Sequence, residues 1–202
     1  DEARAGAALL LAHTLDDQAE TVLLGLGRGS GPRSIAGMRS YDPPWGRPLL
    51  GVRRAVTAAA CAELQLTPWS DPHNTDARFT RVRLRTEVLP LLEDVLGGGV
   101  AEALARTADA LRADGEVLDV LAAQVLDRAR RADGLAVSEL TGVAPAVRRR
   151  VLRAWLLAGG ARGLTDRHVR GVEALVSAWH GQGGVAVPGS RPGHRLFARR
   201  GA

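Results

Sequence analysis

The spacing of apolar positions predicts a strand–loop–helix unit at the start of the chain. Residues 7–12 form a continuous apolar run, which is typical of a strand buried on both faces of a parallel sheet. Thr14 with Asp17 then resembles a helix N-cap with negative charge in the first turn. A helical stripe follows at Ala19, Val22, Leu23 and Leu26. Ligands of open parallel sheets bind at the carboxyl ends of the strands, which makes candidate site residues of His13, Asp16, Asp17 and Gln18.

Glycines and prolines mark the connections that follow. Gly25, Gly27, Gly29 and Gly31 end a helix instead of joining a strand to one, so they are not a dinucleotide-binding loop. We expect a helix over residues 54–66, with Cys61 as a buried structural thiol. A second helix, ending near Pro90, is expected to carry Arg78, Arg81, Arg83 and Arg85.

Beyond Gly97-Gly98-Gly99 the pattern changes to long helices, and we place a domain boundary there, between residues 1–96 and 97–202. A seven-residue repeat predicts a helix of about eight turns, with Leu104, Leu111, Leu118, Val125, Val100 and Leu121 on one side. A second helix is expected to bury Val147, Val151, Leu152, Trp155 and Leu156, and a third spans residues 165–179. The tail alternates weakly, as in a hairpin. The fold class is α/β followed by a mainly α-helical domain, with a short C-terminal β-hairpin.

Composition narrows the possible functions. The 202 residues contain 27 basic side chains, all arginine, against 22 acidic ones. Genomic base composition explains the missing lysine, and forked phosphate contacts are the alternative explanation. Without lysine there is no Walker A loop, and one cysteine excludes disulfide frameworks and multi-cysteine metal sites. No apolar run reaches the ~20 residues of a membrane span, and no signal peptide opens the chain, so we expect a cytoplasmic protein with no membrane partner.

The positive charge is concentrated in the last third of the chain. Residues 137–202 hold 11 arginines and three acids. The run Arg148, Arg149, Arg150 and Arg153 is expected to lie largely opposite the apolar side of its helix. Such a run is either a solvated face or a surface that contacts nucleic-acid phosphates.

One string of motifs runs in a fixed order through residues 12–90. Residues 12–24 read Ala-His-Thr-Leu-Asp-Asp-Gln-Ala-Glu-Thr-Val-Leu-Leu. The string continues through Arg28-Gly29-Ser30-Gly31, Gly37-Met38, Arg47-Pro48-Leu49-Leu50, Asp71-Pro72-His73-Asn74, Arg81, Arg85 and Leu89-Pro90. These motifs resemble the tRNA(Ile)-lysidine synthase family, which belongs to the PP-loop ATP-pyrophosphatases. After residue 96 the likeness rests on the helix layout, Arg167-His168-Val169-Arg170 and Gly181-Gln182-Gly183-Gly184, which resemble the shorter forms of this enzyme.

The resemblance implies a ligase that uses Mg-ATP to modify the first anticodon base of an isoleucine tRNA. In this family the carbonyl oxygen at C2 of that cytidine is adenylated, and the side-chain amine of free lysine then displaces AMP. The implied cofactors are ATP and Mg²⁺, and the implied partners are tRNA(Ile) and lysine. Residues 1–96 then correspond to the C-terminal part of the PP-loop domain, and residues 97–202 to a helical domain that binds tRNA.

Two departures from the family pattern affect this interpretation. The phosphate-binding string Ser-Gly-Gly-x-Asp-Ser does not occur in the 202 residues. We therefore expect an N-terminally truncated synthase that is inactive by itself. Val82 stands where the family has Asn after Arg81, which weakens the assignment of polar contacts around Arg81.

The resemblance suggests roles for the matching residues, each with a structural alternative. Asp16 and Asp17 either orient the lysine amine or help to hold magnesium, or they cap a helix. Glu20 shares their site or pairs with Arg28. Arg81 and Arg85 bind phosphate or carboxylate, or form structural salt bridges. No residue is assigned as a dedicated metal ligand.

The residues expected near the nucleotide or substrate are His13, Gln18, Arg28, Asp71, Asn74, Arg81 and Arg85. The structural alternative for His13 is a buried histidine, and the alternative for Asp71 and Asn74 is a pair that stabilises a turn. The expected tRNA contacts are Arg148, Arg149, Arg150, Arg153, Arg195, Arg199 and Arg200.

Two other functions remain open from the sequence. A tRNA thiolase of the same PP-loop class would be expected to carry more cysteines than Cys61 alone. A non-catalytic RNA-binding module explains the cationic last third, but it gives no reason for the string from His13 to Thr21.

Overall fold

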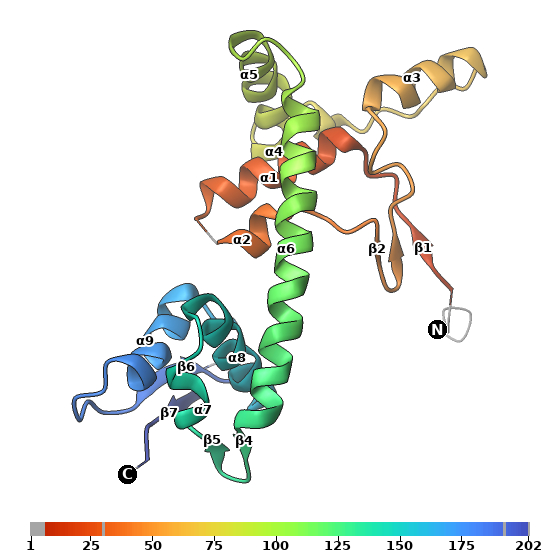
Figure 1. Ribbon diagram of the computed structural model, residues 1–202. Helices are drawn as coiled ribbons and strands as arrows, with labels where there is room; N and C mark the ends of the chain where they lie inside the picture. The colour runs from red at the N-terminus through yellow and green to blue at the C-terminus, as the bar shows by residue number, and fades with distance from the viewer. Residues whose placement is uncertain (1–6, 30, 192, 202) are drawn as a thin grey trace. The chain divides into compact units, whose positions relative to one another are not determined.

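The computed structural model describes residues 7–29, 31–191 and 193–201, and the chain folds as two compact units. These are Asp1–Arg112 and Ala113–Ala202, with the boundary inside the long helix α6 (Val100–Ala129), which is continuous in Figure 1. The predicted long helix is confirmed. Leu121 is 43% exposed, however, and Ala122 is buried beside Val125, because the buried side of α6 follows positions 118, 122, 125, 126 and 129 at helical spacing.

The first unit contains a small sheet in the order β1 (Leu9–Leu10), β3 (Trp45–Gly46) and β2 (Tyr41–Asp42). β1 pairs with β3 in parallel, as the sequence predicts, and β2 is antiparallel to β3. The expectation of burial on both faces is wrong for this strand, since Leu10 is 73% exposed. Strands of two residues offer too little surface for helices to cover.

Helix α1 (Leu15–Gly27) is the centre of the first unit. Ala19 and Val22 are fully buried, whereas Leu26, predicted on the same stripe, is 50% exposed. Ala19 packs with Leu89 and with Ala101 of α6. The helix ends in the glycine-rich loop, as predicted, and α2 (Pro32–Ile35) follows.

Two expected helices differ from the prediction. α3 (Arg54–Glu63) forms, but none of its residues is buried, and Cys61 is only half-buried instead of being a core thiol. After a short 3-10 helix, η2 (Pro72–Asn74), a helical segment runs through α4 (Thr80–Arg83), a π turn (Leu84–Val88) and α5 (Leu89–Val95). It does not end near Pro90. Proline lacks the N–H of a regular helix, and the wider π turn directly before Leu89 lets the chain continue helically.

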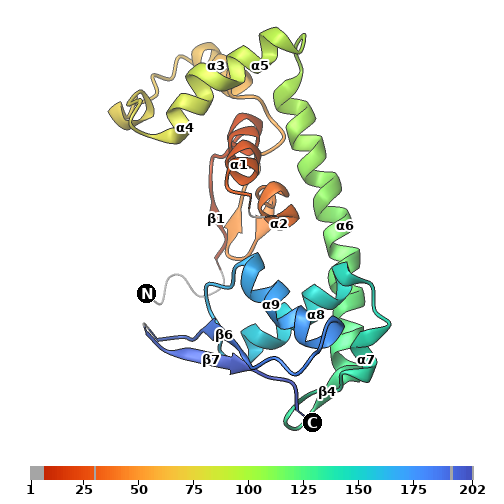
Figure 2. The ribbon, with the colours of Figure 1, turned by 90° about the vertical axis from the view of Figure 1, so that its left-hand side faces the viewer.

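The second unit contains the C-terminal part of α6, the strands β4 (Arg130–Arg131) and β5 (Gly134–Leu135), and the helices α7 (Ser138–Thr141), α8 (Pro145–Ala158) and α9 (Asp166–Ser177). The predicted hairpin is confirmed as β6 (Val185–Pro188) and β7 (Arg195–Ala198), which are antiparallel. Val187 and Ala198 of the hairpin join the core formed by α6, α8 and α9, and Figure 2 shows the two strands side by side.

None of the helices in the described part of the chain has the length and apolar character needed to cross a membrane.

Candidate functional site

The N-terminus of α1 holds the first of three carboxylates. Asp17 Oδ2 accepts hydrogen bonds from the backbone N–H and the hydroxyl of Thr14, each at 2.8 Å, so the predicted helix-capping contact is present. Its other oxygen lies 2.7 Å from Nη2 of Arg54. Burial alone would raise the pKa of Asp17, but the hydrogen bonds from Thr14 and the charges of Arg54 and Arg85 outweigh it and hold the pKa below its usual value.

Asp16 caps a different helix. Its Oδ2 accepts the backbone N–H of Arg54, the first residue of α3, at 2.7 Å. Its Oδ1 is held by Nε and Nη2 of Arg53 at 3.1 Å and 3.0 Å. Arg53 also contacts Glu102 of α6, at 2.6 Å. Asp16 therefore joins the start of α3 to the start of α1, which is a structural role beside any chemical one.

Glu20 lies one turn further along α1 and is fully buried. Arg85 donates to both of its carboxylate oxygens, at 2.8 Å and 3.3 Å. Arg54 and Arg81 lie 3.5 Å and 3.7 Å from the same carboxylate. Glu20 therefore pairs with Arg85 and not with Arg28, and the salt-bridge alternative for Arg81 and Arg85 is the one the structure displays.

Together these residues form an acid–arginine cluster, defined here as Asp16, Asp17, Glu20, Arg53, Arg54, Arg81 and Arg85. Sequence reasoning missed Arg53 and Arg54. One signal was present, because two cations stand at the start of an expected helix, where the helix dipole favours acids. Such cations need carboxylates from elsewhere, and α1 supplies them.

The cluster does not fit a magnesium site. Each of its three carboxylates is paired with at least one arginine. Among the described residues there is no group of three or more His, Cys, Asp or Glu side chains placed to hold a metal ion. No magnesium role is therefore assigned to Asp16 or Asp17.

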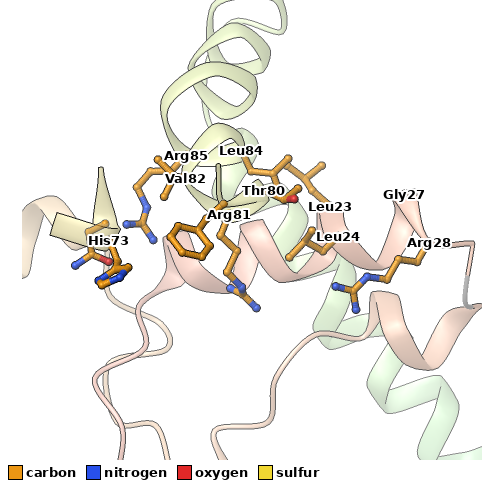
Figure 3. A pocket seen from close by; sticks show the side chains of 12 residues that line it. Leu23, Leu24, Gly27, Arg28, His73, Thr80, Arg81, Val82, Leu84 and Arg85 are labelled. Carbon is orange, nitrogen blue, oxygen red and sulfur yellow. The ribbon is translucent and has the colours of Figure 1, made fainter. Parts of the chain in front are cut away.

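A cavity of about 710 Å³ lies between the C-terminal half of α1 and α4. Its polar lining includes four predicted site residues: Arg28, Asn74, Arg81 and Arg85. Leu23, Leu24 and Phe79 supply apolar walls. In Figure 3, Arg28 from the end of α1 and Arg81 from α4 extend into the same space. This volume is in the range of small-molecule sites, and two guanidinium groups suit a phosphate or carboxylate.

A smaller cavity of about 130 Å³ borders the cluster itself. Its lining includes Asp16, Glu20, Arg53, Arg54 and Arg85 from the cluster. Leu89, Pro90, Glu93 and Ala101 complete the wall. Charged groups of both signs thus surround a space that is small compared with the larger cavity.

Four residues predicted for the site in the first unit line neither of these cavities: Asp17, whose contacts are given above, and His13, Gln18 and Asp71. His13 accepts a hydrogen bond at Nδ1 from Arg47, at 3.3 Å. Gln18 is buried and bonds both backbone groups of Met38, at 2.7 Å and 3.0 Å. Asp71 accepts the backbone N–H of His73 at 2.9 Å within the predicted turn. In the described arrangement these side chains order the connecting loops.

In the second unit, the expectation of an exposed arginine face on α8 is wrong for Arg148. It is 8% exposed and donates to Glu173 from Nε and Nη2, at 3.2 Å and 3.0 Å. Arg148 stands three and four positions before the buried Val151 and Leu152, so its side chain lies on the buried side of α8, where Glu173 balances its charge. Arg150 donates to Asp119 at 2.9 Å, and Arg153 donates to the carbonyl of Leu164 at 3.1 Å.

The other arginines that were predicted to contact tRNA differ in their exposure and in their partners. Arg149 is half-buried and lies 3.8 Å from Glu173. Arg195 and Arg199 are exposed. Arg200 donates to the carbonyl of Leu175 at 3.2 Å and lies over the ring of Trp179, 5.5 Å from its centroid.

Comparison with known proteins agrees with the two-part organisation. Residues 2–92 match a family model described as a PP-loop domain, and residues 135–201 match one described as the TilS substrate binding domain. The chain is 72% identical over 196 residues to the tRNA(Ile)-lysidine synthase of Mycobacterium tuberculosis (strain ATCC 25618 / H37Rv), covering 95% of this chain and 61% of the relative. It is 67% identical over 198 residues to that of Nocardia farcinica, covering 98% and 62%. The chain thus spans about three fifths of the length of the curated relatives it matches.

Proposed function

We propose, since the chain belongs to the tRNA(Ile)-lysidine synthase family, that this protein takes part in joining lysine to C2 of the wobble cytidine of tRNA(Ile). In this reaction the C2 carbonyl oxygen attacks the α-phosphate of ATP and pyrophosphate leaves. The side-chain nitrogen of lysine then attacks C2, and AMP and a proton leave. Making the oxygen part of AMP turns a poor leaving group into a good one, and positioning carries most of the catalysis.

The acid–arginine cluster is the observation that supports a lysine site. An ammonium group needs carboxylates, and Asp16, Asp17 and Glu20 lie on adjacent turns of α1. The guanidinium group of Arg54 already lies 2.7 Å from Asp17, so a cation fits against this carboxylate. The Arg54 side chain is 35% exposed. We assign Asp17 to contact the lysine amine in place of Arg54. Asp16 and Glu20 then fix the neighbouring helices, through Arg53 and Arg85.

The larger cavity is assigned to a phosphate-bearing part of the nucleotide. Arg28 and Arg81 supply the charge, and Asn74 supplies an amide. Magnesium, which the resemblance implies beside ATP, is given no ligands among the described residues. His13, Gln18 and Asp71 are assigned indirect roles, as groups that order the loops around the site.

The tRNA contacts are assigned to the second unit. Arg195 and Arg199 are exposed on the hairpin, and Arg149, Arg153 and Arg200 keep part of their surface accessible. Arg148 and Arg150 hold the unit together through Glu173 and Asp119, so we assign them no direct contact. A protein that binds tRNA and free lysine in solution is expected in the cytoplasm.

An incorporation assay tests the function. The 202-residue chain contains no Ser-Gly-Gly-x-Asp-Ser string, so we expect no ATP-dependent transfer of labelled lysine to tRNA(Ile) by this chain alone. The same chain fused to a PP-loop segment that carries this string is expected to transfer lysine. Transfer by the unfused chain would contradict the inactivity, and failure of a folded, ATP-binding fusion would contradict the ligase assignment.

A substitution in the fusion tests Asp17 directly. Asp17→Ala is expected to abolish lysine transfer while tRNA binding is kept. Asp109→Ala is the control, because Asp109 is 67% exposed and its one ion pair among the residues that the structure describes is with Arg112 on its own helix. Normal transfer by Asp17→Ala would remove Asp17 from the lysine site.

A further inference from the structure

The hairpin and its flanks carry uncompensated positive charge. Glu173 is the last acidic residue of the chain. The 29 residues that follow contain Arg191, Arg195, Arg199 and Arg200 and no acid. Glu173 itself is occupied by Arg148. A surface of one sign attracts the opposite sign over the range set by ionic strength, so a polyanion is the partner that this region favours.

Strand β7 sorts its side chains by face. Ala198 is 4% exposed and Leu196 packs on the core, so these two point inward. Because side chains alternate along a strand, the intervening Arg195, Phe197 and the following Arg199 point outward. All three are exposed, and Phe197 is 61% exposed. The outward face of β7 is therefore an aromatic ring with an arginine on each side, about 7 Å away along the strand.

The neighbouring strand leaves this ring uncovered. Ala186 is paired with Phe197 across the hairpin, and Pro188 is paired with Arg195. Gly184 lies beside Arg199, where an added Cβ would meet the carbonyl of Ala198 at 3.2 Å. Side chains this small do not reach over a phenyl ring. The ring thus offers a flat apolar surface at the edge of a cationic patch.

The two flanking arginines are available for a ligand. Neither Arg195 nor Arg199 makes an ion pair with any residue that the structure describes. Arg200 shows the contrasting arrangement, because it is held by Leu175 and lies over Trp179. The unit therefore uses one arginine–aromatic pair internally and presents a second aromatic with two unpaired arginines.

We propose that the outward face of Arg195, Phe197 and Arg199 binds an unpaired RNA nucleotide, with the base stacked on Phe197 and the flanking phosphates on the two arginines. Duplex bases are already stacked on each other, whereas unpaired bases can lie on an aromatic side chain. The inference rests on the proposed tRNA function and deepens it, since it adds a base contact to phosphate contacts. A loop nucleotide and a single-stranded 3′ end supply the same chemistry.

The test measures binding of the 202-residue chain to labelled RNA by fluorescence anisotropy. The probes are tRNA(Ile), an RNA stem-loop, a blunt RNA duplex, and that duplex with a single-stranded 3′ extension. Phe197→Leu keeps an apolar side chain and removes the ring, so it is expected to weaken binding to tRNA(Ile) and to the stem-loop or the extended duplex by roughly 5- to 150-fold. Binding to the blunt duplex stays unchanged. Phe197→Tyr keeps the ring and is expected to bind like the parent chain.

Removing the two arginine charges is expected to change RNA binding in a different way from removing the aromatic ring. The double variant Arg195→Ala with Arg199→Ala is expected to weaken binding to every probe and to lower the log–log salt slope by about 1.5 to 2. Arg167→Ala is the matched control, since Arg167 is an exposed arginine of α9 in the same unit. It is expected to change neither affinity nor slope to that extent.

Each outcome is decisive. Loss on the stem-loop identifies a loop nucleotide, and loss on the extended duplex identifies the 3′ end. The stacking inference is overturned, while tRNA binding stands, if Phe197→Leu binds every probe like the parent chain. It is also overturned if this variant loses as much affinity for the blunt duplex as for the probes with unpaired nucleotides. If the parent chain binds no tRNA(Ile), the proposed function fails together with it.

Discussion

Arg85 donates hydrogen bonds to both carboxylate oxygens of Glu20, which is fully buried on α1. The arginine stands in the π turn between α4 and α5, so this one pair joins a helical segment to α1 over 65 residues of sequence. Nη2 of Arg85 also lies 3.5 Å from Asp17. Arg85 thus links Glu20 to Asp17, the carboxylate that we assign to the lysine amine.

Removing the charge of Glu20 is expected to destabilise the protein. Glu20→Gln leaves Arg85 partly buried without its anion, and breaking such a pair costs about 3 kcal/mol. Chemical denaturation of the 202-residue chain measures the loss. A double-mutant cycle with Arg85→Met measures the interaction free energy between the two side chains, separately from the other effects of each substitution.

The exposed pair of Arg83 and Glu87 is the matched control for this cycle. It lies on the same helical segment with side chains 61% and 48% exposed, and exposed pairs add little to stability. Glu87→Gln is therefore expected to leave the unfolding free energy nearly unchanged. Equal losses in Glu20→Gln and Glu87→Gln would contradict the importance of burial.

Stability is expected to fall in acid through Asp17. The pKa of Asp17 is held below its usual value in the folded state, so its ionised form stabilises the fold above the unfolded-state pKa of about 3.9. This contribution is lost as the pH falls from there through the lower folded pKa. Unfolding free energies measured from neutral pH downward should show a shallower acid loss in Asp17→Asn than in the parent. Identical slopes would rule out this contribution.

Two glycines of α1 are expected to respond oppositely to alanine. A Cβ on Gly25 would lie 2.5 Å from the carbonyl oxygen of Ser34 in α2, whereas a Cβ on Gly27 meets nothing within 4 Å. Gly25→Ala must push α2 away and is expected to cost about 1 to 3 kcal/mol. Gly27→Ala reduces the freedom of the unfolded chain and is expected to gain up to about 1 kcal/mol. Thermal unfolding of both variants decides this, and a neutral Gly25→Ala would contradict the close packing.

Arg148 is expected to act on stability and not on RNA contact. Arg148→Met leaves Glu173 buried without its closest partner, which costs about 3 to 5 kcal/mol, while Arg149→Met should cost much less because Arg149 lies 3.8 Å from that acid. Adding Glu173→Leu to Arg148→Met should restore most of the loss. If the double variant is no more stable than Arg148→Met, the burial argument is wrong.

Local signals in the sequence were sufficient for most elements of the fold. The capping pair Thr14 and Asp17, the seven-residue stripe of α6 and the alternation of the C-terminal tail each predicted an element that the structure contains. The string from His13 to Thr21 also predicted the similarity to tRNA(Ile)-lysidine synthases that the relatives display. These features depend on neighbours a few positions apart, which a single sequence contains in full.

The same patterns could not predict ion pairs between residues that are far apart in the sequence. The arginine run of α8 looked like one exposed face, yet Arg148 is buried because Glu173 of another helix balances its charge. The pairing of Arg53 and Arg54 could not be predicted, because their carboxylate partners Asp16 and Asp17 stand on α1, each 37 residues away. Pro90 does not end the helical segment, because it stands in the first turn of α5, directly after the π turn, where proline is tolerated.

The sequence by itself determined the order and kind of most helices, the C-terminal hairpin, the concentration of arginine in the last third and the family. Only the tertiary structure decided which arginines form ion pairs with acidic residues of the same chain and which remain on the surface, as Arg195 and Arg199 do beside Phe197. The physical reason is that the free energy of a charge depends on its solvation and on the nearest opposite charge. Both are set by segments that meet only when the chain folds.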